Sequence, residues 1–574
     1  MLLAHPKSMT DVLRNRALSS PERVALRFLL DGELREQSLD YAELDHLARA
    51  AAAVIQQRCS AGDRVLLMYP PGVDFVVAFF ACMYAGVISV PAYPPDPSRP
   101  TRTIPRLQEM ASDAKPVAVL TSSAAIGLRG FLEEHAPELS ALPWIVTDEL
   151  PTGAEDCWVE RSPHADDVAF LQYTSGSTGA PKGVVLSHGN LLHNSQAIRH
   201  AFHLSEDTVA VSWLPPYHDM GLIGGLLQPV FAGFPVVLLS PLHAIERPMR
   251  WLEAISRYRA TVSGGPNFAF DLCVRKSTAH ERAGLDLSEW RLAFVGADTV
   301  RPETLRRFAE AFAPAGFTSA SLYPCYGLAE ATLLVAGAIR RREPLIRRFD
   351  RTALIDGIAS DPADTEESVE RVSTGQACLG TVVEIRDPDT GRPCPDGRVG
   401  EICVHGPGVA QGYWERPVLS ADVFPTDGQG RRWLRTGDLG VTLDGELYFV
   451  GRAKDVVVLQ GVSHHPQDLE NTAERVGHLL RVGSGAAFSV GPDGDEDLVL
   501  VYEIVRGKEA TAEDLEAESE RVRTALLAEH GVRLSELVLI RSGSIPKTSS
   551  GKIQRQATKM LYEAEALDQV VPLT

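Results

Sequence analysis

The chain has 574 residues, of which 44% are hydrophobic and 23% are charged, and its formal net charge is −19 at pH 7. This length predicts roughly three or four folding units rather than one small core. The negative charge argues against nucleic acid and anionic membranes as partners, and an acidic protein partner would need a local basic patch to dock.

The cysteines and the apolar stretches bear on the compartment. Eight cysteines are scattered without a Cys-x-x-Cys pair or a zinc-like His/Cys spacing, which favours a reduced, cytoplasmic protein. The N-terminus lacks the long apolar core of a signal peptide. Residues 221–239 are nearly uncharged but contain Gln228, Pro229 and Pro235, so we expect a buried helix followed by a buried strand and no integral membrane contact.

The first half of the chain alternates between helical and strand patterns. A capping box at residues 40–43 opens a helix whose apolar residues recur on one face as far as Ile55. A strand at 65–68, an apolar helix at 73–84 before Gly86 and a strand at 87–90 follow, with further strands at 236–239, 261–263 and 292–295. This alternation predicts a parallel sheet covered by helices on both faces.

The most informative stretch runs from residue 173 to 183 and reads Tyr-Thr-Ser-Gly-Ser-Thr-Gly-Ala-Pro-Lys-Gly. Glycines let backbone N–H groups point at phosphate oxygens, hydroxyls add donors, and Lys182 adds a mobile positive charge. Apolar runs at 168–173 and 184–186 place this loop between two strands, and it does not match a Walker A loop. We predict a polyphosphate-binding loop, because the alternative of an ordinary Ser/Gly hairpin turn does not account for the Pro-Lys-Gly ending.

The second half of the chain has a different composition. Residues 338–375 carry a cluster of arginines and then an acidic tract, which predicts an exposed insertion with a solvated loop as its default structure. Short strands at 382–386, 401–404 and 446–450 indicate a β-rich subdomain. Strands at 456–459, 486–490, 498–505 and 537–540 then alternate with helices, one of them between Thr511 and Gly531.

These patterns predict an α/β fold in two domains. Residues 1–453 form a large domain of parallel-rich sheets with helices plus a β-rich subdomain, and this domain includes the insertion at 338–375. Residues 454–574 form a small, mobile α+β domain that carries a Ser/Gly loop with Lys552.

Further clusters match in order what an ATP-dependent carboxylate activator requires. Tyr326, at a predicted loop-to-helix junction, can stack on a purine, and Glu330 of the same cluster can hold Mg²⁺, although a capped core helix is the alternative. Asp438 ends an Arg-Thr-Gly-Asp turn and can accept both ribose hydroxyls, with Arg452 as a second contact.

Two of the clusters have a strong structural alternative. His218 stands on a loop before the apolar stretch, where a histidine is more often structural than functional. Lys552 lies in a loop without apolar anchoring, the usual setting of a solvated surface lysine. The joint order and spacing of all the clusters favour a functional role for both residues.

Together, these segments resemble the core motifs of the adenylate-forming (ANL) superfamily over roughly residues 10–565, and within it those of the fatty acyl-AMP ligases. The supporting segments are residues 92–95, 218–224, 264–268, 326–332 and 465–468, which read Ala-Tyr-Pro-Pro, His-Asp-Met-Gly-Leu-Ile-Gly, Gly-Gly-Pro-Asn-Phe, Tyr-Gly-Leu-Ala-Glu-Ala-Thr and His-Pro-Gln-Asp. The tract at 338–375 lies about where that family carries an insertion that is taken to restrain the C-terminal domain and to disfavour transfer to free coenzyme A.

The resemblance implies a role for each matching residue. The β- and γ-phosphates would be bound by Thr174, Ser175, Gly176, Ser177, Thr178, Gly179 and Lys182. The adenine would lie beside Gly296, Ala297 and Asp298 and would stack on Tyr326, next to Gly327, Leu328 and Ala329. The remaining expected roles are ribose binding by Asp438 and Arg452, Mg²⁺ ligation by Glu330, a hinge at Lys454, and catalysis by Lys552, at the substrate carboxylate and α-phosphate, and by His218.

Three segments depart from the family pattern. Asp298 stands where the family usually has Glu. Residues 242–248 are less apolar than usual before Arg-Pro, which implies an unusual acid if this segment lines the acyl tunnel. Residues 460–463 lack the basic and Asn-containing pattern expected of the hinge-side contacts.

The resemblance implies a fatty acyl-AMP ligase that uses ATP and Mg²⁺ to convert a medium- or long-chain fatty acid to an acyl-adenylate. The acyl group would then pass to the phosphopantetheine thiol of an acyl carrier protein. A fatty acyl-CoA synthetase is the nearest alternative because it shares every nucleotide motif. An amino-acid adenylation domain, with Asp219 binding the substrate amine, and a non-catalytic nucleotide-binding scaffold are weaker alternatives.

Overall fold

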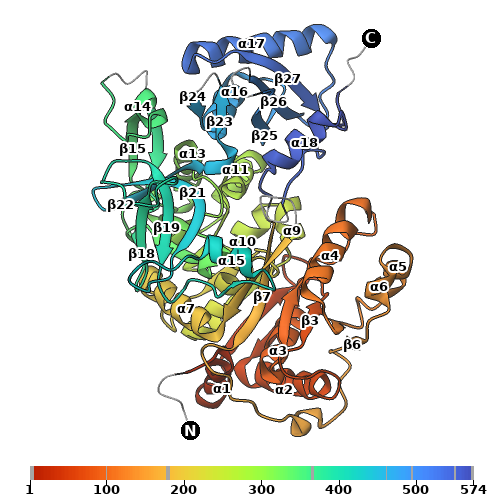
Figure 1. Cartoon of the computed structure of the whole chain (residues 1–574). Coiled ribbons are helices and arrows are strands. Elements are labelled where there is room, and N and C mark those ends of the chain that lie inside the picture. Colours follow the sequence, from red (N-terminus) through yellow and green to blue (C-terminus); the bar gives the residue numbers. More distant parts are fainter. Residues whose placement is uncertain are drawn as a thin grey trace.

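The computed structural model describes residues 6–98, 100–175, 181–363, 368–459, 462–492, 496–548 and 551–570. Figure 1 shows a large body formed by most of the chain, with a smaller body of C-terminal residues, coloured blue, above it. Within the described ranges, no helix combines the length and the apolar character that a membrane span requires.

Two large sheets form the centre of the large body. Within the described residues, one has seven strands in the order β20-β8-β7-β4-β3-β5-β6, and the other has nine in the order β17-β14-β13-β12-β11-β9-β10-β1-β2. The inner pairs of both sheets are parallel, and antiparallel pairs occur only toward the edges among these strands. The predicted parallel-rich α/β fold is therefore confirmed.

The strands of the two sheets have the following bounds. The seven-stranded sheet contains β3 (Arg64–Leu67), β4 (Ile88–Pro91), β5 (Ala118–Thr121), β6 (Trp144–Val146), β7 (Val168–Ser175), β8 (Pro181–Ser187) and β20 (Gly412–Tyr413). The nine-stranded sheet contains β1 (Val24–Leu29), β2 (Glu36–Asp40), β9 (Ala210–Ser212), β10 (Val236–Leu239), β11 (Val262–Gly265), β12 (Leu292–Val295), β13 (Leu322–Gly327), β14 (Leu334–Gly337) and β17 (Gln376–Ala377).

Helices cover the faces of these sheets (Figure 1). The α-helices of the large body are α1 (Met9–Ser19), α2 (Tyr41–Gln56), α3 (Val73–Ala85), α4 (Pro100–Ala114), α5 (Leu128–His135), α6 (Pro137–Ser140), α7 (His188–Phe202), α8 (Gln228–Ala232), α9 (Pro241–Glu246), α10 (Met249–Tyr258), α11 (Asn267–Lys276), α12 (Ala279–Ala283), α13 (Pro302–Phe312), α14 (Arg351–Ile355) and α15 (Pro417–Val423). The expected box opens α2, where Asp40 and Glu43 each accept a hydrogen bond from the other's backbone N–H. Gly86, with φ of +74°, ends α3 in the left-handed conformation that glycine adopts without strain.

The apolar stretch at 221–239 is a buried helical segment followed by a buried strand, as predicted. It comprises η2 (Met220–Leu227), which is a π-helix, then α8, and then β10. One side of this segment packs into the main hydrophobic core through Leu222, Ile223, Leu226 and Leu227.

The predicted β-rich subdomain is a four-stranded antiparallel sheet. Its strands are β18 (Val382–Arg386), β19 (Gly400–His405), β21 (Leu434–Leu443) and β22 (Glu446–Arg452). The segment at 338–375 is not a solvated loop throughout, because β15 (Ile346–Asp350) pairs antiparallel with β16 (Ser368–Val372). Phe349 and Leu354 of this segment are buried against Tyr448 of the four-stranded sheet. The many charges of this segment predict exposure, but burial of these few apolar residues is enough to fold the segment onto the sheet.

The smaller body has its own sheet and cores. It contains β23 (Val457–Leu459), β24 (Val462–His464), α16 (Pro466–Val476), β25 (Leu480–Val490), β26 (Asp497–Ile504), α17 (Ala512–His530), β27 (Leu534–Ile540) and α18 (Arg555–Glu563). The sheet β25-β26-β27 separates two hydrophobic clusters, both made only of residues after 456. As predicted, Thr511 caps the start of α17 and Gly531, with φ of +65°, ends it.

Candidate active site

One large cavity, with a volume of about 2050 Å³, lies between the two bodies. Its lining brings together most of the residues expected to act on the nucleotide and the acid: Thr174, Lys182, His218, Ala297, Asp298, Tyr326, Gly327, Leu328, Ala329, Glu330, Asp438, Arg452, Lys454 and Lys552. Gly296 is not in this lining, and a Cβ on it would come within 2.9 Å of Cys325 Sγ.

The predicted phosphate loop connects two strands, as expected. Thr174 on β7 and Lys182 on β8 are cross-strand partners in an antiparallel pair, so the strands hold both ends of the loop. Ser175 ends β7. Gly176, Ser177, Thr178 and Gly179 lie outside the described residues. The Lys182 ammonium lies 5.5 Å from the centroid of the Tyr413 ring, within range of a cation–π interaction.

The expected ribose residues form a connected group. Asp438 and Arg452 are directly opposite each other on β21 and β22, and Arg452 Nε lies 3.2 Å from Asp438 Oδ1. The Tyr326 hydroxyl donates to Asp438 Oδ2 at 2.8 Å. Burial and the Asp438 carboxylate raise the pKa of Tyr326 well above its usual value, so the hydroxyl stays a donor at neutral pH. The carboxylate is therefore held in one orientation from two sides.

The local structure after Tyr326 differs from the expected helix. Tyr326 and Gly327 end β13, and only a single 3₁₀ turn, η5 (Ala329–Ala331), follows. Thr332 then takes a φ of +70°, which stops a right-handed helix. Gly327 has no alternative here, because a Cβ would lie 1.8 Å from the carbonyl oxygen of Leu333.

Glu330 is connected to the phosphate loop through Tyr413, whose ring lies 5.5 Å from the Lys182 ammonium. Glu330 Oε1 accepts a hydrogen bond from the Tyr413 hydroxyl at 2.9 Å. Burial raises the pKa of Glu330, which shows that its negative charge lacks full compensation from the protein. Among the described side chains, no group of three or more His, Cys, Asp or Glu residues forms a metal site. The single carboxylate of Glu330 fits Mg²⁺, which in nucleotide sites is bound by one or two carboxylates together with substrate phosphates.

His218 and Asp219 form a close pair at the start of η2. His218 Nδ1 lies 2.6 Å from Asp219 Oδ1, which also accepts from the backbone N–H of Met220 at 2.6 Å. Burial acts to raise the pKa of Asp219, but the His218 ring and the Lys552 ammonium lower it below its usual value. Asp219 is therefore an ionised carboxylate inside the cavity at neutral pH.

Lys552 reaches the cavity from the C-terminal body and is not a solvated surface lysine. Its backbone carbonyl accepts from the Thr548 N–H at 2.8 Å, which folds the loop back on itself. Gly551, with φ of +86°, would place a Cβ only 3.2 Å from the Phe268 ring of the large body. Burial and the neighbouring Arg452 lower the pKa of Lys552. The charges of Asp298, Asp219 and Asp438 oppose this shift, so the ammonium lies among three carboxylates.

Lys454 lies where the chain passes from one body to the other. It is part of η6 (Ala453–Asp455), between β22 and β23. Its carbonyl accepts from Gln556 Nε2 at 3.3 Å, and burial lowers the pKa of its ammonium to about 8.

Contacts between the bodies hold Lys552 in this position. Arg371 Nη2 on β16 pairs with Asp468 Oδ2 on α16 at 2.7 Å, and both side chains are nearly buried. Arg301 Nη1 pairs with Glu474 Oε2 at 2.8 Å. The sequence does not reveal these pairs or the contacts of Tyr413 with Glu330 and Lys182, because no local pattern links residues that are so far apart in the chain.

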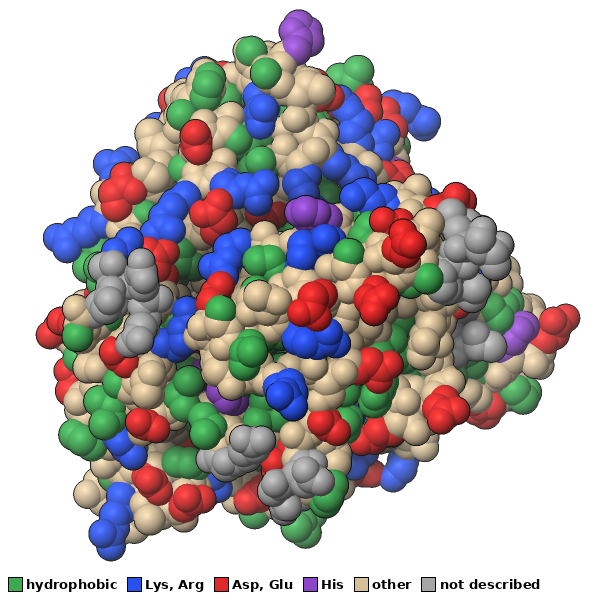
Figure 2. Space-filling model, turned by 90° about the horizontal axis from the view of Figure 1, so that it is seen from above, with side chains coloured by type: hydrophobic (Ala, Val, Ile, Leu, Met, Phe, Trp, Pro, Cys, Tyr) green, Lys and Arg blue, Asp and Glu red, His purple; other side chains and the backbone are tan. Residues whose placement is uncertain are grey.

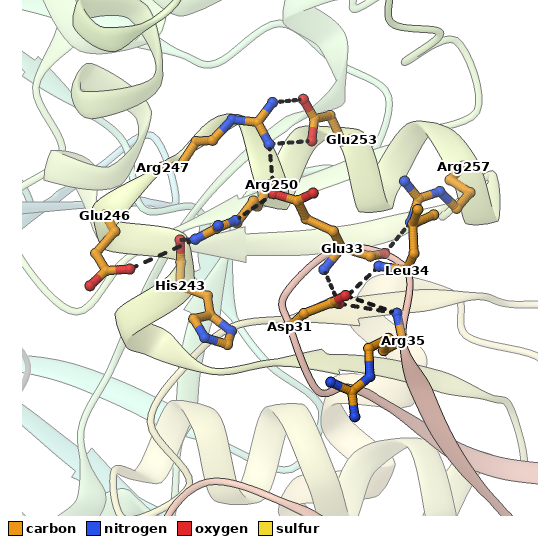
Figure 3. Close-up of polar contacts among 10 residues, drawn as sticks. All are labelled: Asp31, Glu33, Leu34, Arg35, His243, Glu246, Arg247, Arg250, Glu253 and Arg257. Carbon is orange, nitrogen blue, oxygen red and sulfur yellow. Dashed lines mark hydrogen bonds and ion pairs between the residues drawn. The ribbon is translucent and has the colours of Figure 1, made fainter.

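Residues 242–248 contribute only partly to the cavity. Ile245 lines it, whereas Arg247 pairs with Glu33 and Glu253 outside. Figure 3 shows Glu33, from the β1–β2 connection, between the guanidinium groups of Arg247 and Arg250. The charged residues of this segment therefore fasten the β1–β2 connection to α9 and α10.

A family model described as AMP-binding enzyme matches residues 13–414, which is more than half of the chain. The chain belongs to this family.

Similar proteins in the AMP-binding family cover nearly the whole chain. The medium-chain-fatty-acid–(acyl-carrier-protein) ligase JamA of Moorena producens is 42% identical over 570 residues, which cover 98% of this chain and 96% of JamA. The long-chain-fatty-acid–AMP ligase FadD32 of Mycolicibacterium smegmatis is 36% identical, with 94% and 92% covered. The crystal structure of a fatty acyl-adenylate ligase from L. pneumophila in complex with acyl adenylate and pyrophosphate has a TM-score of 0.76 at 36% identity, with 100% of this chain and 99% of that chain covered.

Proposed function

We propose that this chain is a fatty acyl-AMP ligase, which joins a medium- or long-chain fatty acid to AMP and then passes the acyl group to an acyl carrier protein. The observation that carries the proposal is the cavity between the two bodies, where Lys552 lies among the expected nucleotide residues and whose lining also includes many apolar side chains. The names of JamA and FadD32 give fatty acids as the substrates of those enzymes.

The first half-reaction forms the mixed anhydride. A carboxylate oxygen of the acid attacks the α-phosphorus of ATP, and the bond from that phosphorus to the bridging oxygen of pyrophosphate breaks. Two anions must meet, so charge neutralisation and positioning are the main demands. Lys552 neutralises charge at the carboxylate and the α-phosphate, and Lys182 does so at the leaving phosphates. The acid is already ionised at neutral pH, so the step needs no general base.

The remaining cavity residues bind and orient. Asp438 and Arg452 hold the ribose, Tyr326 faces the adenine, and His218 orients the Asp219 carboxylate beside Lys552. Glu330 would hold Mg²⁺, which would neutralise phosphate charge.

The second half-reaction transfers the acyl group. The thiol of a phosphopantetheine arm attacks the acyl carbon, and AMP leaves with the electrons of the anhydride bond. The chain divides into a large domain at 1–453 and a small domain at 454–574, with Lys454 as the hinge. The ion pair between Arg371 and Asp468 supports a restraining role for the insertion, because it ties β16 to the small domain.

The surface supports a protein partner with acidic character. Figure 2 looks onto the molecule from the side of the small domain, and Lys and Arg side chains gather there in a band. This local basic surface occurs although the whole chain carries a net charge of −19. A cytoplasmic location agrees with the eight cysteines, all of which are free in the structure.

The test is a screen of fatty acids with ATP and Mg²⁺, scored separately for acyl-AMP, acyl-CoA and acyl-carrier product. We expect acyl-AMP from at least one acid, acyl-carrier product with a phosphopantetheinylated carrier, and little acyl-CoA. Efficient acyl-CoA formation would instead identify an acyl-CoA synthetase. Pyrophosphate exchange that depends on amino acids would identify an amino-acid adenylation domain, and no pyrophosphate release with any acid would leave a non-catalytic scaffold.

A further inference from the structure

The inner end of the cavity is built from apolar side chains. They come from the nine-stranded sheet on one side and from α7 and the segments that follow it on the other: Ile198, Phe202, Leu204, Phe234, Val236 and Val262. The charged lining residues, such as Lys552, lie toward the junction of the two bodies. Under the proposed function, the inner end therefore receives the hydrocarbon chain of the acid.

One face of the helical segment η2–α8 borders this inner end. A Cβ on Gly224 would lie 3.3 Å from Leu333 Cδ2. A Cβ on Gly225 would lie 2.7 Å from Ser212 Oγ. Leu333 and Ser212 both line the cavity, so the two glycines keep open a space that larger side chains would narrow.

Gln228 lies on the same face, one turn further along. The segment before it, η2, is a π-helix, in which residues about four or five apart share one face, so Gln228 follows Gly224 on that face. The neighbouring Leu226 and Leu227 pack instead into the main hydrophobic core. Gln228 also lines the cavity.

The amide of Gln228 is buried without a partner. The side chain is only 2% exposed, and neither Oε1 nor Nε2 has a hydrogen-bond partner within the part of the chain that the structure describes. An unpaired buried amide costs free energy, and a plain hydrocarbon chain next to it would leave it unpaired. A hydroxyl can donate to Oε1 and accept from Nε2, whereas a carbonyl can accept from Nε2.

We propose that Gln228 determines specificity by selecting fatty acids that carry a hydroxyl group, which can satisfy both amide atoms, on the carbon that lies beside it. This inference rests on the proposed function, since it requires an acyl chain in the cavity. A site built to hydrogen-bond a substrate group discriminates against the analogue without it, because binding the analogue leaves buried polar atoms unpaired.

The test uses the full-length protein and acids of equal length. Dodecanoate is compared with hydroxydodecanoates whose hydroxyl occupies successive carbons from mid-chain to the end, and kcat/KM is measured by pyrophosphate release. We expect one hydroxy isomer to exceed dodecanoate on the order of tenfold, equivalent to about 1.4 kcal/mol. Gln228→Leu should abolish this preference by lowering kcat/KM for the hydroxy acid on the order of tenfold more than for dodecanoate.

Two further variants keep the test decisive. Ser195→Ala removes a buried hydroxyl on α7 that does not line the cavity and that, like the Gln228 amide, has no hydrogen-bond partner among the described residues. It should leave the preference unchanged. Gln228→Met replaces Gln228→Leu if the latter does not fold. The inference is wrong if no hydroxy isomer is preferred, or if the preference survives both Gln228 variants. Dodecanoate turnover by the wild-type protein tests the proposed function separately.

Discussion

At the scale of single residues, the main feature of the site is how positive and negative side chains are distributed in the cavity. Lys552 brings one ammonium into a cavity that already holds the carboxylates of Asp219, Asp298 and Asp438. The reaction adds a fatty carboxylate and a triphosphate, so the site needs positive charge to neutralise these anions. The partial burial that lowers the pKa of Lys552 also strengthens its interaction with any anion that enters.

Replacing the cavity lysine tests this role. We expect Lys552→Ala to slow adenylation by on the order of 10²–10³, roughly 3–4 kcal/mol, as does removal of one transition-state donor in other enzymes. Pyrophosphate release in a single turnover is the measurement, and ATP binding should change much less. Lys559→Ala is the matched control, because Lys559 lies on α18 and only pairs with Glu563. An adenylation rate equal to that of the wild type would remove Lys552 from the mechanism.

At the scale of elements, the pair β15–β16 and helix α14 connect the four-stranded sheet to the C-terminal body. Phe349 and Leu354 pack on the sheet, whereas Arg371 faces α16. Breaking a nearly buried ion pair leaves one charge uncompensated, so this contact resists separation of the two bodies.

Loss of the Arg371–Asp468 contact should relax the choice of acceptor. We expect Arg371→Ala to raise the ratio of acyl-CoA to acyl-AMP product by about tenfold, because a freer small domain reaches more orientations. Both products are quantified by mass spectrometry after reaction with ATP and coenzyme A. Arg347→Ala is the control, since Arg347 on β15 pairs with the exposed Asp361 and Asp444 and lies over the Phe349 ring, all within the large body. An unchanged product ratio would contradict a restraint through β16.

The same interface should weaken at acid pH. Burial and the Arg351 guanidinium lower the pKa of His530 from 6.5 to about 4, so the folded state favours the neutral ring. The groups that face this ring are Arg351, His464, Asp468, Thr472 and Glu529. The unfolded chain binds the proton near pH 6.5, so stability falls as the pH drops from about 6.5 to about 4.

The expected loss from His530 alone is about 2 kcal/mol between pH 7.5 and pH 5. Urea unfolding of the wild type and of His530→Gln at both pH values measures it, because glutamine retains hydrogen bonding but does not titrate. His46→Gln, at a half-exposed ring beside Glu155, is the control. Equal pH dependence in the wild type and in His530→Gln would show that His530 is not responsible.

At the scale of the whole molecule, the arrangement of the two bodies decides which half-reaction the site can perform. The structure has Lys552 inside the cavity, which is the arrangement that the proposed adenylation step requires. Transfer needs a path for a thiol to the same acyl carbon, so the proposed cycle requires the small domain to move.

A rigid backbone at the connection should separate the two steps. Proline holds φ near −65°, so we expect Lys454→Pro to leave adenylation within a few-fold of the wild type and to slow acyl transfer by about tenfold or more. Single-turnover formation of acyl-AMP and of acyl-carrier product measures the two steps. Lys454→Ala, which keeps the backbone free, should affect them equally. If Lys454→Pro transferred the acyl group as fast as it formed acyl-AMP, Lys454 would not be a hinge.

Local patterns in the chain were sufficient to predict most elements, and many of the residues they single out line the cavity. The caps at Asp40 and Thr511, the loop between β7 and β8, and the strands of the four-stranded sheet all follow from residues close together in sequence. The motif that contains Tyr326 was also visible, but its helix was not formed, because Thr332 takes a positive φ. Caps and periodicity act over a few residues, so contiguous sequence records them.

Other features arise only from packing. Tyr413 meets Glu330 across 83 residues, and Arg371 meets Asp468 across 97. From its local sequence, Lys552 is predicted to be a surface lysine and Gln228 an ordinary polar residue. Lys552 enters the cavity because the small body packs on the large one, and Gln228 does so because its helical segment packs against the sheet. Such contacts depend on how distant segments pack, and burial then sets the pKa values and unpaired groups on which the chemistry depends.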